Sequence, residues 1–129
     1  MTRTDENEKS VVERRKYKRV AVKIPVEYEL FRAISQAVIA KNKAARFTAV
    51  SENISAGGMQ IITELDLPQE QIVKLKILNE NSPRMCAHAM VRWSAFDEDA
   101  GRFRVGLEFF YLKDECRDFI SELTGQSIN

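Results

Sequence analysis

Hydrophobic and polar residues alternate along much of the chain, which is typical of strands that bury one face. The longest example spans residues 20–30, where every second residue is apolar: Val20, Val22, Ile24, Val26, Tyr28 and Leu30. Pro25 lies within this run and cannot donate a ladder hydrogen bond, so we expect a sheet edge or a bulge there. The pattern therefore predicts one long strand near the start of the folded chain.

The same alternation recurs in shorter runs that are separated by turn-forming residues. It predicts strands at 47–53, 59–63, 72–78, 85–94 and 103–109, with turns at 55–58, 67–68, 79–83 and 97–102. At 55–58, Gly57 and Gly58 relieve the steric limits on φ and favour a tight turn. Residues 31–46 fit either a helix or a hairpin, and the sequence leaves both open.

The end of the chain changes to helical spacing. Apolar residues recur at intervals of three and four in Leu112, Cys116, Phe119, Ile120 and Leu123, which predicts a helix over 112–124. Asp114 is a candidate cap or first-turn acid, and Gly125 is a natural stop. About six short strands and a final helix indicate a mainly all-β fold, a six-stranded antiparallel β-barrel with a C-terminal α-helix.

Composition limits what such a barrel can bind. The chain has 129 residues and a net charge of +1, which fits one domain and argues against DNA binding. We expect a flexible tail at 1–12 and a barrel domain at 13–129. No apolar segment suits a signal peptide or membrane insertion, so we expect a cytoplasmic protein. Cys86 and Cys116 lack metal-ligand spacing and are interpreted as buried free thiols.

Two short motifs carry the candidate chemistry. Residues 14–19, Arg-Arg-Lys-Tyr-Lys-Arg, form a dense basic run just before the first predicted strand. Residues 53–58, Asn-Ile-Ser-Ala-Gly-Gly, form a turn between two strands. Taken singly, each has an ordinary explanation, because basic runs are usually solvated and Asn, Ser and Gly favour turns. A local basic cluster in a near-neutral protein does favour a small anionic ligand.

Together, in this order, the two motifs make the chain resemble PilZ domains. Arg15 and Arg19 match the arginine pair of that family, and Arg14 matches its common preceding arginine. A second match is to the Asp/Asn-x-Ser-x-x-Gly motif of the same family, formed by Asn53, Ser55 and Gly58. The order of the later residues also fits, with Val91-Arg92-Trp93 followed by a late strand at 105–109, and the resemblance covers roughly residues 13–125. It implies a six-stranded barrel that serves as a bacterial receptor for cyclic di-GMP, without any cofactor.

The resemblance also implies a role for each matched residue. Arg15 and Arg19 would clamp the phosphates and guanines, with Arg14 assisting, since guanidinium groups suit both. Asn53 would bind a guanine edge, and the Ser55 hydroxyl would bond the ligand or fix the turn. Gly57 and Gly58 would let the backbone approach the ligand with its N–H groups available.

The strand 85–94 contributes one further candidate site residue, Trp93. Trp93, the single tryptophan, is either a core residue or a stacking surface for a base, and alternation slightly favours the core. Arg92 should then point to the opposite face and be exposed. His88 has no second histidine or carboxylate pattern beside it, so we interpret it as packed or solvated.

These features predict a receptor and not an enzyme, because the sequence contains no recognised catalytic motif. Ligand binding would order the arginine segment, and a downstream protein partner would recognise the changed surface. The alternative is a PilZ-like adaptor that acts through protein contacts without the nucleotide. The receptor hypothesis requires that folding bring residues 14–19 and 53–58 to the same side of the barrel.

Overall fold

The computed structural model describes residues 17–31, 46–78 and 85–126. Within these ranges the elements follow in the order β1 (Val20–Ala21), β2 (Pro25–Phe31), β3 (Arg46–Ile54), β4 (Gly58–Thr63), β5 (Ile72–Ile77), β6 (Met85–Asp97), β7 (Arg102–Leu112) and α3 (Asp114–Thr124). The five predicted strands after residue 46 are all present, and four of them are longer than expected. The predicted tail at 1–12, the turn at 79–83 and the connection at 32–45 lie outside the described residues.

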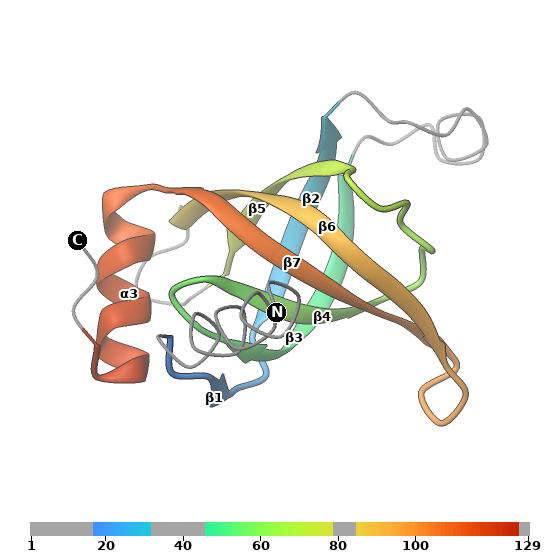
Figure 1. Ribbon diagram of the computed structural model, residues 1–129, viewed down its shortest axis with the longest axis horizontal. Helices are drawn as coiled ribbons and strands as arrows, with labels where there is room; N and C mark the ends of the chain where they lie inside the picture. The colour runs from blue at the N-terminus through green and yellow to red at the C-terminus, as the bar shows by residue number, and fades with distance from the viewer. Residues whose placement is uncertain (1–16, 32–45, 79–84, 127–129) are drawn as a thin grey trace, which may run out of the picture.

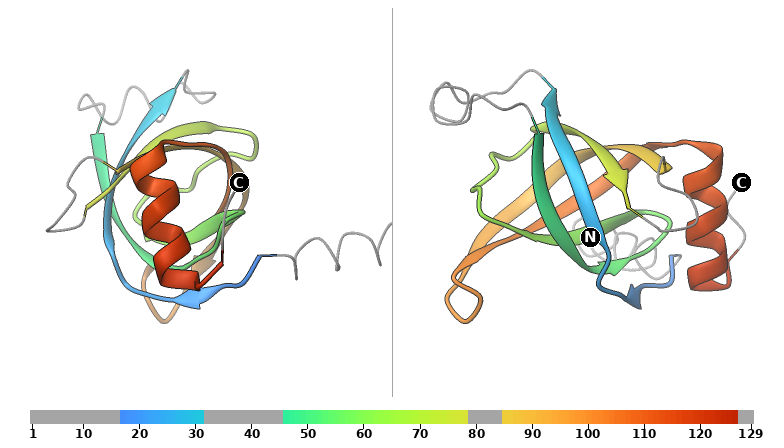
Figure 2. Two further views of the ribbon diagram at one scale, coloured as in Figure 1. Left: turned by 90° about the vertical axis from the view of Figure 1, so that its left-hand side faces the viewer. Right: turned by 180° about the vertical axis from the view of Figure 1, so that it is seen from behind.

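Six of the strands close into an antiparallel barrel, which confirms the predicted fold class (Figure 1). The ladder runs β3-β2-β5-β6-β7-β4, and pairing of β4 with β3 closes it. The short β1 is an extra strand that pairs with the end of β3. Inward-facing apolar side chains fill the barrel, and α3 lies across one of its ends, where it buries Cys116 and Ile120 (Figure 2).

The predicted continuous strand over 20–30 is wrong at its middle, where regular pairing is interrupted between β1 and β2 although Val22 N still donates to Glu52 O and Ser51 N to Ile24 O. Ser51, which is only 1% exposed, fills this break. Its Oγ accepts a hydrogen bond from Ile24 N at 2.9 Å and donates to Val22 O at 2.6 Å. Pro25 begins β2, a position that requires no N–H donor. The buried hydroxyl thus replaces ladder hydrogen bonds that a continuous strand would have made.

Three register shifts interrupt the ladders, and each leaves one residue without an opposite partner. Glu52 is the extra residue of β3 against β4, because Ser51 pairs with Ile61 and Asn53 with Gln60. Arg92 is the extra residue of β6 against β7. In β7 the extra residue is Phe110. Since side chains alternate with a period of two, each extra residue reverses which of the following positions face the core.

The helix α3 begins two residues later than predicted, because Leu112 still belongs to β7. Lys113 occupies the N-cap position without a side-chain capping bond, so Asp114 acts as a first-turn acid rather than as the cap. Gly125 ends the helix at φ 69°, as predicted. Burial raises the pKa of the Cys116 thiol to about 12, whereas Cys86 is only partly buried. Among the described helices, none has the length and apolar character needed to cross a bilayer.

Replacing Ser51 with alanine should lower the free energy of unfolding by about 1–3 kcal/mol, because the buried Ile24 N–H loses its acceptor. Urea unfolding followed by circular dichroism measures the change. Ser94→Ala is the matched control, since that hydroxyl bonds Asp66 at an exposed site and its loss should cost no more than about 0.5 kcal/mol. Equal losses in the two variants would contradict the role given to Ser51.

Candidate functional site

A surface depression of about 940 Å³ lies over β4, β6, β7 and the turn that precedes β4. The residues lining it are Tyr17, Arg19, Ser55, Ala56, Gly57, Gly58, Met59, Gln60, Gln69, Arg92, Trp93, Gly106, Leu107, Glu108 and Phe109. They include five of the predicted site residues, drawn from three distant parts of the sequence. Asn53 does not line the depression but contacts a residue that does. Arg14 and Arg15 lie outside the described residues.

The two sequence motifs meet through one hydrogen bond. Arg19 Nη1 donates to Asn53 Oδ1 at 2.8 Å, across 34 positions of sequence. The pairing of Ala21 with Asn53 explains the contact, because β1 runs antiparallel to the end of β3 and brings the preceding residues alongside it. The described end of the basic run is therefore on the same side of the barrel as the turn at 55–58, as the receptor hypothesis requires.

The residues ahead of β1 are held at two further points. The ring of Tyr17 lies against Gly57, so closely that a Cβ at Gly57 would come within 2.9 Å of Tyr17 Cδ2. The backbone N–H of Lys18 donates to Gln126 Oε1, just beyond α3, at 2.6 Å. Residues 17–19 are consequently fixed against the glycine turn, the end of the helix and the end of β3.

The turn itself is organised by Ser55, which is only 3% exposed. Its N–H donates to Gly58 O at 2.8 Å, and its Oγ accepts from Gly57 N at 3.1 Å. Of the two roles considered for this hydroxyl, the geometry favours fixing the turn. The expectation that the turn leaves its N–H groups available is wrong for Gly57, whose N–H is engaged by Ser55.

The glycines serve close packing and not an unusual backbone conformation. Neither Gly57 nor Gly58 has a positive φ, which corrects the reason given from the sequence. A Cβ at Gly58 would collide with the carbonyl oxygen of Leu107 on the paired strand β7. Gly57 O in turn accepts from Phe109 N at 2.9 Å. The pair of glycines thus allows the turn to lie directly on β7, at the edge of the depression.

Trp93 lies on the surface and not in the core, which corrects the slightly favoured interpretation. It is 41% exposed, and its indole covers Gly106 so closely that any side chain there would collide with the ring. The extra residue at Arg92 causes this, since Val91 still faces the core and the register then shifts by one. The ring presents an aromatic surface to the depression.

Arg92 does not point to the opposite side from Trp93, as alternation predicted, but lines the same depression. Its Nη2 lies 2.7 Å from Glu108 Oε1, and the hydrogen bond and charge of Glu108 raise the pKa of Arg92. Sequence reasoning also gave no site role to Tyr17 or Glu108. Tyr17 lies within the basic motif, and this could have marked it as a site residue. The positions of Arg92 and Glu108 depend on strand pairing, which no local sequence pattern encodes.

The remaining residues that could carry chemistry, among them His88 and Asp97, have structural roles in the described part of the chain. The ring of His88 packs beside Tyr111 and Phe110, with centroids 5.1 and 6.0 Å away, in agreement with a packed histidine. Asp97 pairs with Arg104 at 2.8 Å and accepts a hydrogen bond from Asp99 N, so it holds the β6–β7 turn. No group of three or more His, Cys, Asp or Glu side chains that could hold a metal occurs within the three described ranges.

Comparison with known structures supports the fold. The structure of the *Bacillus subtilis* inhibitor of motility MotI/DgrA aligns with a TM-score of 0.63 and 20% identity, over 86% of this chain and 49% of that one. This chain thus spans about half the length of that protein. The structure described as the PilZ domain with c-di-GMP of YcgR from *Escherichia coli* aligns with a TM-score of 0.57 and 13% identity, covering 87% of this chain and 89% of that one.

At these identities the two structures establish a shared fold. No curated protein sequence matches significantly. The profile described as the PilZ domain matches residues 13–126, nearly the whole chain and the span that contains both motifs. The chain therefore belongs to the PilZ domain family.

Proposed function

We propose that this protein is a cytoplasmic receptor that binds cyclic di-GMP in the depression beside the turn at 55–58. The observation that carries the proposal is the 2.8 Å hydrogen bond from Arg19 to Asn53, which joins the two motifs at one place. Membership of the PilZ family supports the nature of the ligand, as does the related *E. coli* domain, which is described with c-di-GMP. The proposed role is binding and not catalysis.

The chemistry of the site suits a dinucleotide with two phosphates and two guanines. Guanidinium groups bind phosphate oxygens in a bidentate manner and also donate to the O6 and N7 acceptors of guanine. Asn53 Oδ1 is already occupied by Arg19, so the amide N–H groups of Asn53 remain suited to those same acceptors. Trp93 offers a flat surface on which a guanine can stack.

The rest of the proposal concerns Arg14, Arg15 and the output. Arg15 would clamp the ligand together with Arg19, and Arg14 would assist, as the spacing of the motif suggests. Ligand binding would then order the arginine segment, and a downstream protein would recognise the resulting surface. Such a switch works only if the ligand binds the ordered state more tightly than the unliganded one.

Arg19→Ala and Arg15→Ala should each weaken cyclic di-GMP binding about tenfold or more, because each loses a charge-assisted contact. Isothermal titration calorimetry measures the affinity, and circular dichroism checks that the barrel stays folded. Arg102→Ala is the matched control, since Arg102 is exposed at the start of β7 and does not line the depression. Unchanged affinity in both site variants would refute the assignment of the arginines, and a wild-type protein that binds no ligand would favour the adaptor.

Trp93→Ala should weaken binding by about 1–3 kcal/mol, or roughly five- to 150-fold, if a guanine stacks on the indole. Because Trp93 is the single tryptophan, its fluorescence in the wild-type protein should change on titration with the same midpoint as calorimetry. Phe96→Ala is the control, since this exposed aromatic residue lies on the same strand but outside the depression. If the tryptophan fluorescence does not change at saturating ligand, the binding site lies elsewhere.

A further inference from the structure

A second arginine stands in the depression, and neither sequence motif contains it. Among the described residues that line this depression, the charged ones are Arg19, Arg92 and Glu108. Arg92 and Glu108 form an ion pair of 2.7 Å, with side chains 47% and 53% exposed. An anionic ligand that enters the depression therefore meets the carboxylate of Glu108. This carboxylate is paired with Arg92, a cation that the ligand could bind in its place.

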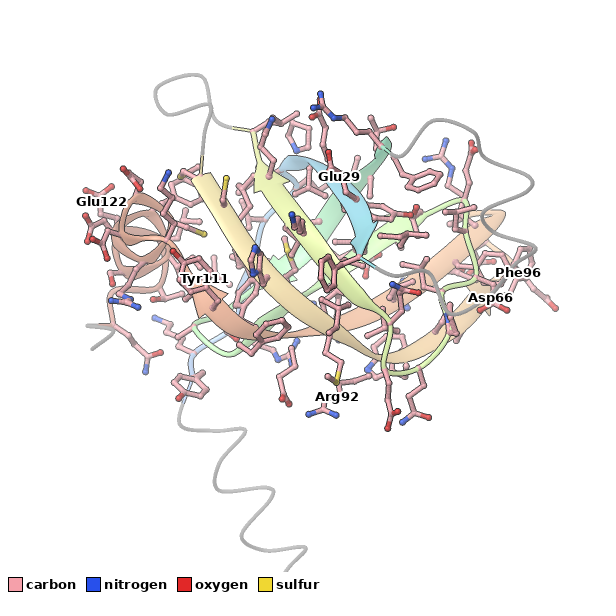
Figure 3. The ribbon with its side chains drawn as sticks, turned by 90° about the horizontal axis from the view of Figure 1, so that it is seen from above. Glu29, Asp66, Arg92, Phe96, Tyr111 and Glu122 are labelled. Carbon is pink, nitrogen blue, oxygen red and sulfur yellow. The ribbon has the colours of Figure 1, made fainter. Side chains whose placement is uncertain are left out.

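The backbone fixes where both partners lie. Arg92 is the extra residue of the β6–β7 register shift, so its side chain leaves the barrel next to Trp93 instead of opposite to it. Figure 3 shows Arg92 projecting away from the barrel into open surroundings. Glu108 lies directly across from Gly58 in the β4–β7 ladder, and thus beside the turn that contains the second motif. The ion pair thus joins a residue next to Trp93 to a residue that pairs with Gly58.

The energetics favour an exchange of partners. An ion pair exposed to this extent is worth only about 0–1 kcal/mol, so Arg92 can leave Glu108 at little cost. A phosphate offers the guanidinium a bidentate, charge-assisted interaction of the stronger kind. Once Arg92 has turned to the phosphate, the carboxylate of Glu108 is left near a ligand of the same charge, and like charges repel. The two residues should therefore act on affinity in opposite directions.

We propose that Arg92 is a ligand-binding residue that exchanges Glu108 for a phosphate of the dinucleotide, and that Glu108 lowers the affinity by competing for Arg92. This inference rests on the proposed function and deepens it, because it adds a cation outside the arginine motif and a resident anion that opposes the ligand. Arg92 and Glu108 would then act on the affinity together with the arginines of residues 14–19.

The test is a titration of cyclic di-GMP by calorimetry into the full chain and four variants. Arg92→Ala should weaken binding about tenfold or more, as the loss of a charge-assisted contact should. Glu108→Gln should tighten binding several-fold, because the competing charge is gone while the side chain keeps its size. Arg102→Ala and Glu98→Gln are the matched controls, since both residues are exposed near the β6–β7 turn and neither lines the depression. Both controls should bind like the wild type.

The double variant Arg92→Ala/Glu108→Gln separates a direct contact from a mere neutralisation of Glu108. A direct contact predicts that the double variant binds about tenfold or more weakly than Glu108→Gln alone. Equal affinity of these two variants would overturn the inference, as would weaker binding by Glu108→Gln than by the wild type. If Arg19→Ala weakens binding while Arg92→Ala behaves like Arg102→Ala, the proposed function stands and this inference falls. A wild-type protein without cyclic di-GMP affinity would overturn both.

Discussion

The site depends on single extra residues in two barrel strands. In a regular strand every second residue faces the core. Asn53, four residues after the buried Ala49, and Trp93, two residues after the buried Val91, would therefore both face inward. The extra residues Glu52 and Arg92 reverse that alternation, so that Asn53 and Trp93 lie outside. Bulges commonly re-aim side chains in this way next to functional sites. Regular alternation places only every second residue of a strand outside the barrel, whereas the bulge in β6 exposes the successive residues Arg92 and Trp93.

Strand pairing then brings other site residues close to Asn53 and Trp93, the side chains that the bulges expose. The two residues of β1 pair with the end of β3 and bring Arg19, at the described end of the basic run, to Asn53, while β4 lies on β7 because Gly58 permits the close approach. Tyr17, Arg19, the turn at 55–58 and Trp93 consequently line one depression although they are far apart in sequence. The ring of Tyr17 on Gly57 shows that the same glycine turn also receives the segment that carries the arginines.

The sequence was sufficient to predict most of the strands and the helix, because alternation and helical spacing are local properties of the chain. It was also sufficient to indicate the family, because the two motifs are short and local. The helix over 114–124 and its end at Gly125, for example, follow from the spacing of Cys116 and Ile120 and from one glycine. It was insufficient wherever the outcome depends on a partner strand. The break around Ser51, the exposure of Trp93 and the position of Arg92 all follow from register, which is a property of two strands together. The resemblance supplied the motif residues, but it included Glu108 only as part of the late strand at 105–109 and implied no site role for it.

The hydrogen bond from Lys18 N to Gln126 Oε1 has a consequence for the architecture of larger proteins. It places the entrance and the exit of the barrel domain next to each other, on the side where the basic run meets the barrel. A domain whose two ends are adjacent can be inserted into a surface loop of a host protein with little distortion of either. In such an insertion the N-terminal linker would lead toward the residues that contact Asn53 and Gly57, so strain on that linker would act on the edge of the depression.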